Sequence, residues 1–259
     1  MNGKTSDSVS YVRYAGNEAR QVEKPLVREA PWTIHINGQK LVTLLCTPDK
    51  MNFMALGFLA AEGLIESLDD VLLLRVCEEE EGVIDVKLKN AEISTPSHPI
   101  LLSGCGGGIT FDDLSDGHPR LNSTFKMSTT RIAALMRELR RRAEAYQIAG
   151  GTHASALADR EGLLVVAEDV GRHNTLDKIR GECLFHDIPT SDRLLLTTGR
   201  ISSEMVNKAV KMEIPIVASL TSPTDLAVKL ARSWEMTIVG YVRGEKMNVY
   251  TRPDRISAD

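Results

Sequence analysis

Residues 194–220 read LLLTTGRISSEMVNKAVKMEIPIVASL, and this stretch decides the fold. A short apolar run over residues 194–198 predicts a buried strand, residues 202–213 predict a helix, and residues 216–220 predict a second strand. A strand, a crossover helix and another strand form the unit from which parallel α/β sheets are built.

The same alternation continues on both sides of this unit and predicts a largely parallel α/β sheet with right-handed crossovers. A preceding stretch, Thr129 to Gln147, predicts a helix with apolar residues on one face and basic residues on the other. The other expected elements are strands at 153–158, 163–168 and 237–242, and helices at about 171–186 and 224–234.

The first part of the chain predicts a smaller α+β unit. Trp32 to Ile36 alternates apolar and polar residues, Asn37-Gly38 is a favoured hairpin turn, and Leu41 to Leu45 forms the returning strand. Thr47 suits the N-cap of a helix that ends at Gly63. A second hairpin is expected from Val71–Cys77 and Val83–Leu88.

Three segments follow from these patterns. Residues 1–22 are polar and patternless, which predicts a mobile tail. Residues 23–123 are expected to form the small α+β domain, which ends in a long glycine-rich connection, and residues 124–259 are expected to form the α/β domain.

Composition narrows the functional classes. Of the 259 residues, 42% are hydrophobic and 25% are charged, and the formal net charge is -4, so general binding to nucleic acid or to a membrane surface is not expected. The sequence shows no signal-peptide pattern and no long apolar run, which predicts a cytoplasmic protein. The four cysteines have no zinc-binding spacing.

Three loops are expected at the carboxyl edge of the sheet, where helix N-termini favour anions. They are Glu168–Asn174, Thr197–Ser202 and Ser219–Thr224. Arg172 and Arg200 could bind phosphate oxygens, and the hydroxyls of Ser202, Ser222 and Thr224 could donate to them. The same hydroxyl residues also suit helix N-caps, so the two interpretations stay open for each loop.

Two histidines lie near this expected edge. Asp169 and His173 are four residues apart, so the carboxylate could orient the imidazole as a general base, which would suit a nucleotide hydrolase. Alternatively, Asp169 caps the helix and His173 contacts ligand or solvent. His153 is expected to be a core or ligand-contacting histidine rather than a metal ligand.

Cys105 is the candidate reactive residue, because the run Ser103-Gly104-Cys105-Gly106-Gly107-Gly108 does not resemble a core. Glycines remove steric shielding, and their amides can stabilise a thiolate. A phosphate-binding loop or an inert loop are the alternatives, although the run has no P-loop lysine. The other cysteines, Cys46, Cys77 and Cys183, are assigned to packing.

An ordered set of short motifs covers nearly the whole chain after the tail. It comprises Trp32–Gly38, Cys46–Pro48, Leu56–Leu59 with Glu62-Gly63, Gly150–Ala154, Glu168–Asn174, Thr198–Arg200, Ser222–Thr224, and Tyr241–Gly244 before Val249–Thr251. With these motifs the chain resembles the formate dehydrogenase accessory sulfurtransferase family, FdhD.

The resemblance implies a homodimeric sulfurtransferase. It would accept persulfide sulfur from a cysteine desulfurase on Cys105 and pass it to a molybdenum or tungsten bis(pterin guanine dinucleotide) cofactor of formate dehydrogenase, with GDP as a partial mimic. The large domain would be a three-layer α/β/α domain like cytidine deaminase, but the H-x-E and P-C-x-x-C zinc ligands of deaminases are absent. The cofactor-binding residues expected are Arg172, His173, Thr198, Gly199, Arg200, Ser202, Ser222, Thr224, Tyr241, Val242, Arg243, Gly244, Glu245 and Lys246.

One departure from the family matters. The family commonly has C-G-x-C-G, whereas this chain keeps Cys105 and has Gly108 at the position of the second cysteine. A relay through one cysteine remains possible, because a second nucleophile can take the terminal sulfur of a persulfide. The departure also leaves open a chaperone that binds the pterin cofactor and carries no sulfur.

Overall fold

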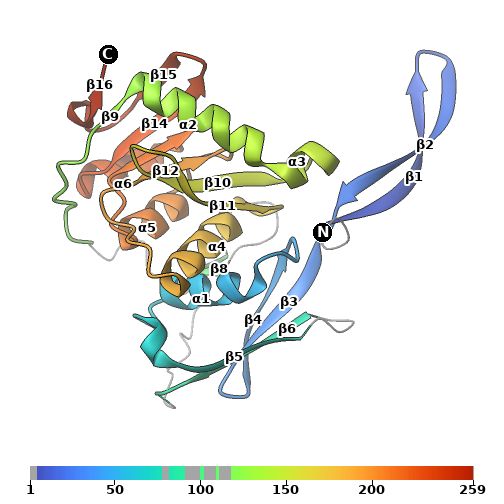
Figure 1. Ribbon diagram of the computed structural model, residues 1–259, viewed down its shortest axis with the longest axis horizontal. Helices are drawn as coiled ribbons and strands as arrows, with labels where there is room; N and C mark the ends of the chain where they lie inside the picture. Colours follow the sequence, from blue (N-terminus) through green and yellow to red (C-terminus); the bar gives the residue numbers. More distant parts are fainter. Residues whose placement is uncertain (1–4, 78–81, 91–99, 102–108, 111–117, 259) are drawn as a thin grey trace.

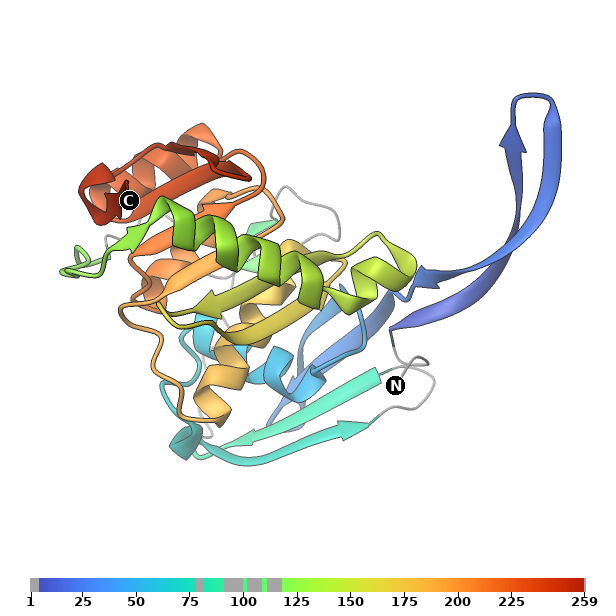
Figure 2. The same ribbon diagram turned by 45° about the horizontal axis from the view of Figure 1, so that its top comes forward.

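The structure, a computed structural model, describes residues 5–77, 82–90, 100–101, 109–110 and 118–258. They form a large sheet with helices on both faces, a smaller sheet beneath it, and a hairpin that projects away from both (Figures 1 and 2). A mixed α/β fold, as expected from the sequence, is confirmed. The likeness of the large domain to cytidine deaminase stays a prediction.

The large sheet has six strands in the order β11-β10-β12-β13-β14-β15. It contains β10 (His153–Ala158), β11 (Leu163–Asp169), β12 (Leu194–Thr197), β13 (Ile216–Ser219), β14 (Thr237–Arg243) and β15 (Lys246–Val249). Only β12, β13 and β14 run parallel, whereas β10 is antiparallel to both of its neighbours and β15 is antiparallel to β14.

The expectation of a largely parallel sheet is therefore wrong. Residues 159–162 join β10 to β11 by a tight turn, in which the Asp159 carboxylate accepts from the amides of Glu161 and Gly162. A parallel connection needs a crossover of a dozen or more residues, so a turn this short allows only a hairpin.

Helices cover both faces of the large sheet (Figure 1). One face packs against α2 (Thr129–Arg142), which is followed by the short α3 (Glu144–Ala149). The other packs against α4 (Arg172–Phe185), α5 (Ser203–Lys211) and α6 (Asp225–Ser233). Alternate residues of β12 and β13 enter the two hydrophobic clusters, as the two-residue period of a strand requires.

The helix expected over residues 129–147 is divided at Ala143. The Gln147 side chain donates to the carbonyls of Arg140 and Arg141 and so satisfies the end of α2. The Glu168 carboxylate accepts from the amides of Ala145 and Tyr146 at the start of α3. The backbone carbonyls at the end of α2 and the backbone amides at the start of α3 thus have hydrogen-bond partners, which stabilises the break between the two helices.

The small domain has a four-stranded sheet in the order β4-β3-β6-β5, with α1 (Met51–Ala61) packed against its apolar face. Its strands are β3 (Ala30–Ile36), β4 (Gln39–Cys46), β5 (Val71–Cys77) and β6 (Gly82–Leu88), with the 3-10 turn η1 (Leu68–Asp70) before β5. Both expected hairpins are confirmed. The parallel pairing of β3 with β6 joins them into one sheet.

Helices α1 and α4 hold the two domains together at a close crossing. A β-carbon on Gly57 would overlap the carbonyl of Asp177, and one on Gly181 would overlap the carbonyl of Phe53. Only glycine allows the two backbones to approach this closely.

Thr47 belongs to the same junction and does not cap α1 as expected, because Lys50 occupies the N-cap position. The Thr47 amide donates to the Asp169 carboxylate at 3.0 Å, and its carbonyl accepts from Lys178 Nζ at 3.0 Å. Lys178 and Asp169 form an ion pair of 2.7 Å with fully buried side chains. A buried charge needs such a partner, so the junction is held by polar contacts as well as by packing.

The N-terminal region is an antiparallel hairpin, so the expected tail is wrong for the residues described. Strands β1 (Ser6–Ala15) and β2 (Glu18–Val27) pair over ten residues each and project away from the body (Figure 2). Gly16 takes a positive φ of 63° in the turn. Both faces of the hairpin carry polar side chains, so the periodicity that usually marks a strand is weak.

The remaining elements are two short strand pairs and one 3-10 turn. They are β7 (Ile100–Leu101) with β8 (Ile109–Thr110), β9 (Met127–Ser128) with β16 (Ile256–Ser257), and η2 (Pro253–Arg255). Among the residues described here, no helix is long and apolar enough to span a membrane.

Candidate functional site

Strand register brings the three predicted loops to one edge of the large sheet. His153 pairs with Asp169, Ser155 pairs with Thr197, and Thr197 pairs with Ser219. The carboxyl ends of β11, β12 and β13 therefore meet there, together with the start of β10. This is the edge at which α/β sheets bind ligands.

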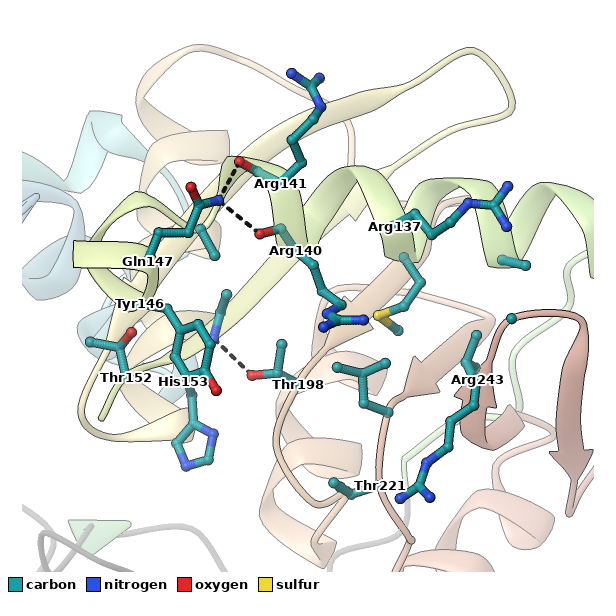
Figure 3. A pocket seen from close by; sticks show the side chains of 17 residues that line it. Arg137, Arg140, Arg141, Tyr146, Gln147, Thr152, His153, Thr198, Thr221 and Arg243 are labelled. Carbon is teal, nitrogen blue, oxygen red and sulfur yellow. Dashed lines mark hydrogen bonds between the residues drawn. The ribbon is translucent and has the colours of Figure 1, made fainter. Parts of the chain in front are cut away.

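A cleft of about 930 Å³ opens at this edge, between α2, α3 and the ends of the strands (Figure 3). Three arginines of α2 line it, namely Arg137, Arg140 and Arg141, and Arg243 lines it from β14. The remainder of the wall includes Thr198 and Thr221. Guanidinium groups and hydroxyls are suited to phosphate or carboxylate oxygens.

Four of the predicted cofactor-binding residues line this cleft: Thr198, Val242, Arg243 and Gly244. The Arg243 guanidinium lies 5.7 Å from the ring centre of Tyr241. Tyr241 has a positive φ of 54°, and its amide donates to the carbonyl of Thr221. The chain thus bends at the end of β14, beside the cleft. Glu245 and Lys246 continue into the turn and β15.

The other predicted residues belong to the neighbouring loops and do not line the cleft. Ser202 caps α5 by accepting from the Met205 amide, and Thr224 caps α6 by accepting from the Ala227 amide. The capping interpretation therefore holds for both residues. Whether they also contact a ligand stays a prediction, as it does for Arg172, His173, Gly199, Arg200 and Ser222.

Asp169 and His173 do not form the catalytic pair that their spacing allows. Asp169 accepts from the Gly171 amide and from Asn174 and pairs with Lys178. His173 Nε2 instead lies 3.0 Å from Ser202 Oγ and 2.9 Å from a Glu204 carboxylate oxygen. Because α4 begins only at Arg172, Asp169 is not in the helical turn that would align its side chain with His173. The hydrolase interpretation loses its geometric basis.

A buried charged network extends from His173 into the core. Lys208 Nζ lies 3.8 Å from Glu204 and 2.6 Å from Asp177. Burial raises the pKa of Asp177, and the charge of Lys208 opposes this effect. The network thereby connects α4, which contains His173 and Asp177, to α5, which contains Glu204 and Lys208.

His153 lies between the cleft and the Arg172 loop. It lines the cleft, and its Nδ1 would be 3.2 Å from a β-carbon built on Gly199. Burial lowers the pKa of His153, and the charge of Arg172 lowers it further. The sequence pattern did not separate a core histidine from a ligand-contacting one, whereas its position in the cleft wall favours the second.

The arginines of α2 are the site residues that sequence reasoning missed. The basic face of the predicted helix is visible in the run Arg137-Glu138-Leu139-Arg140-Arg141. Such a face usually points to solvent, and only the position of α2 above the sheet edge places these arginines at the cleft, where Arg140 points toward the strand ends (Figure 3). Cys105 lies outside the described residues. Within them, no cluster of three or more His, Cys, Asp or Glu could hold a metal ion.

The model of the FdhD/NarQ family matches residues 27–257. The chain belongs to the FdhD/NarQ family. The match includes the small domain, the large sheet and the cleft, whereas nearly all of the β1–β2 hairpin precedes it.

Curated relatives and a solved structure agree with this membership. The "Sulfur carrier protein FdhD" of Bacillus subtilis (strain 168) is 36% identical over 262 residues, which cover 99% of each chain. That of Bacillus pumilus (strain SAFR-032) is 38% identical over 237 residues, which cover 90% of each chain. The crystal structure of a formate dehydrogenase accessory protein from Desulfotalea psychrophila has a TM-score of 0.82 and 26% identity, and covers 98% of this chain and 100% of its own.

Proposed function

We propose that this FdhD/NarQ protein is a sulfur carrier that serves formate dehydrogenase. The curated relatives bear the name of sulfur carrier, and the solved structure from Desulfotalea psychrophila bears the name "putative formate dehydrogenase accessory protein". In the proposed function, a cysteine desulfurase supplies the sulfur, Cys105 carries it, and a molybdenum or tungsten bis(pterin guanine dinucleotide) cofactor receives it. The observation that supports binding of the cofactor is the cleft lined by arginines.

The cleft suits the phosphate groups of such a cofactor. Arg137, Arg140, Arg141 and Arg243 line one cavity, so several negative charges can be neutralised together. Ligand pockets commonly measure ~300–1,000 Å³, so a cleft of about 930 Å³ has room for one guanine nucleotide arm. The apolar Val242 and Met136 side chains supply a non-polar wall beside these cations.

The sulfur step needs one thiolate and no external oxidant. The Cys105 thiolate attacks the terminal sulfur of the desulfurase persulfide, the S–S bond of the donor breaks, and the donor cysteine leaves as a thiolate. When a nucleophile of the acceptor attacks the terminal sulfur, a bond forms between that nucleophile and the sulfur, the S–S bond to Cys105 breaks, and its electron pair stays on Cys105 as a thiolate. The presence of Gly108 in place of a second cysteine is compatible with this sequence of steps.

Persulfide loading is the first test. After incubation with a cysteine desulfurase and cysteine, mass spectrometry of the digested protein is expected to show one additional sulfur on the peptide that contains Cys105. Cys46 and Cys183 serve as internal controls, because burial raises the pKa of each thiol to about 12 and keeps it protonated. Sulfur on Cys77 alone, or on no cysteine, would contradict the relay and favour a chaperone that only binds the cofactor.

The cleft itself is tested by nucleotide binding. Replacing Arg140 or Arg243 with Gln is expected to weaken GDP binding about tenfold or more, since a hydrogen bond to a charged group contributes ~1.5–3 kcal/mol. Isothermal titration calorimetry measures the affinity. Arg232→Gln is the matched control, because Arg232 is exposed on α6 and does not line the cleft. Equal affinities for all three variants would place the GDP site elsewhere.

A homodimer and a cytoplasmic location complete the proposal. Both follow from the resemblance and the composition rather than from a contact in the structure. The exposed hairpin offers one surface for self-association, since Val12 and Tyr14 are 54% and 74% exposed.

A further inference from the structure

His153 occupies a position from which it can respond to a ligand in the cleft. It is the first residue of β10, it lines the cleft, and its ring approaches Gly199 of the neighbouring loop. In Figure 3 the imidazole points away from the arginines of α2. The ring therefore lies on the side of the cleft that faces the loops after β11 and β12.

The charges around His153 are mostly positive. Arg172 and His173 approach it from the start of α4, and Arg200 approaches it from the loop after β12. Across the cleft, α2 and β14 contribute Arg140 and Arg243. Together with burial, the neighbouring charges lower the pKa of His153 and favour the neutral imidazole in the empty protein.

The nearby carboxylates are already engaged. Asp169, the acidic group that raises the pKa of His153, is paired with the buried Lys178 at 2.7 Å. Glu168 accepts from two amides of α3 and from Thr152. Within the described part of the chain, neither of these two carboxylates is available as a close partner of His153, and an anion in the cleft would supply the charge that compensates its protonated form.

His173 differs from His153 in this respect. Its Nε2 already lies within 3.0 Å of Ser202 and 2.9 Å of Glu204, so it has a carboxylate partner within the protein. An incoming anion changes the charge balance more at His153 than at His173. Of the two histidines at this edge, His153 is the one that should respond.

We propose that His153 is a ligand-binding residue of the cleft and that it takes up a proton from solvent when an anionic ligand binds. This inference rests on the proposed binding of a phosphate-bearing ligand in the cleft. A bound anion favours the imidazolium over the neutral imidazole, so the pKa of His153 is higher in the complex than in the empty protein. Linkage then requires that affinity increases as the pH falls through this range and decreases as it rises.

Calorimetry of GDP binding tests the proton uptake. Titrations in two buffers with different ionisation enthalpies give the number of protons bound per GDP. We expect net uptake at about pH 6.5, where histidines titrate, and almost none at about pH 8. A terminal phosphate that binds as the dianion would release protons near its pKa of about 6, so the ligand itself contributes the opposite sign.

Two variants test whether His153 is the residue that takes up the proton. His153→Gln is expected to abolish the uptake and to leave only the proton release from the phosphate of GDP, so the affinity no longer decreases as the pH rises. His35→Gln, in the small domain, is the matched control and should leave the uptake and the dependence of affinity on pH unchanged. Uptake that persists in the folded His153→Gln variant would overturn the inference.

A measurement on the unmodified protein covers the case in which His153→Gln does not fold. Titration of the histidine Cε1–H resonances by NMR, with and without GDP, should show one histidine whose pKa rises on binding, and its contacts should assign it to residue 153. GDP binding without such a rise overturns this inference and leaves the proposed function intact. Absence of GDP binding overturns both.

Discussion

Replacing Gly181 with alanine is expected to lower the free energy of unfolding by about 3 kcal/mol, the upper end of the usual effect of overpacking. The added β-carbon would overlap the backbone carbonyl of Phe53 on α1. A backbone atom cannot change rotamer, so α1 and α4 would have to separate. Urea unfolding measures the change, and the melting temperature should fall by roughly 6–12 °C.

The expected loss of stability is informative, because a glycine-to-alanine change in a helix usually has the opposite effect. Alanine is a better helix former than glycine by about 1 kcal/mol, so in an open helix the same change would stabilise the protein. Gly162→Ala is the control, because a β-carbon there meets no atom within 4 Å and Gly162 has no positive φ. If Gly181→Ala were as stable as Gly162→Ala, the close crossing of α1 and α4 would be wrong.

Replacing Cys105 with alanine is expected to abolish activation of formate dehydrogenase. No second cysteine lies in the glycine-rich run, so no neighbouring thiol can take over the sulfur. The assay compares formate dehydrogenase activity in cells that lack the endogenous carrier and express either form of the protein.

GDP binding separates the two parts of the proposed function. The Cys105→Ala variant should bind GDP as the unmodified protein does, because the four arginines of the cleft are unchanged. Cys77→Ser is the matched cysteine control and should retain activation. Full activation by Cys105→Ala would end the sulfur-carrier proposal, whereas a loss of GDP binding would show that the substitution disturbs the cleft.

The sequence predicted the elements of the fold better than their arrangement. The helices that begin near residues 172, 203 and 225 and the strands between them lie within a few residues of their expected bounds. These elements carry strong local patterns. Strand direction depends on connection length, and the turn at residues 159–162 was enough to make the sheet mixed rather than largely parallel. The role of Thr47 could not be predicted from its local sequence either, because its partners Asp169 and Lys178 are more than 120 residues away.

Only part of the candidate site was predicted, because some of its residues are positioned by contacts between segments that are distant in the sequence. Residues in the strand-end loops could be assigned to one edge from topology alone, and Thr198 does line the cleft there, whereas Arg243, which also lines it, was expected from the family resemblance. Arg140 could not be assigned, because its role depends on how α2 packs across the sheet. A pair of Asp169 with His173 was one of two interpretations that their spacing left open, and the structure instead places Glu204, from a different helix, beside His173. Contacts between distant segments determine these positions.

The adjacent residues Glu168 and Asp169 hold different parts of the molecule. The Glu168 carboxylate fixes the start of α3, whose Tyr146 and Gln147 form part of the cleft wall. The Asp169 carboxylate binds the Thr47 amide of the small domain, from which the chain continues toward Cys105. Two residues joined by one peptide bond therefore connect the wall of the cleft to the segment of the chain that precedes Cys105.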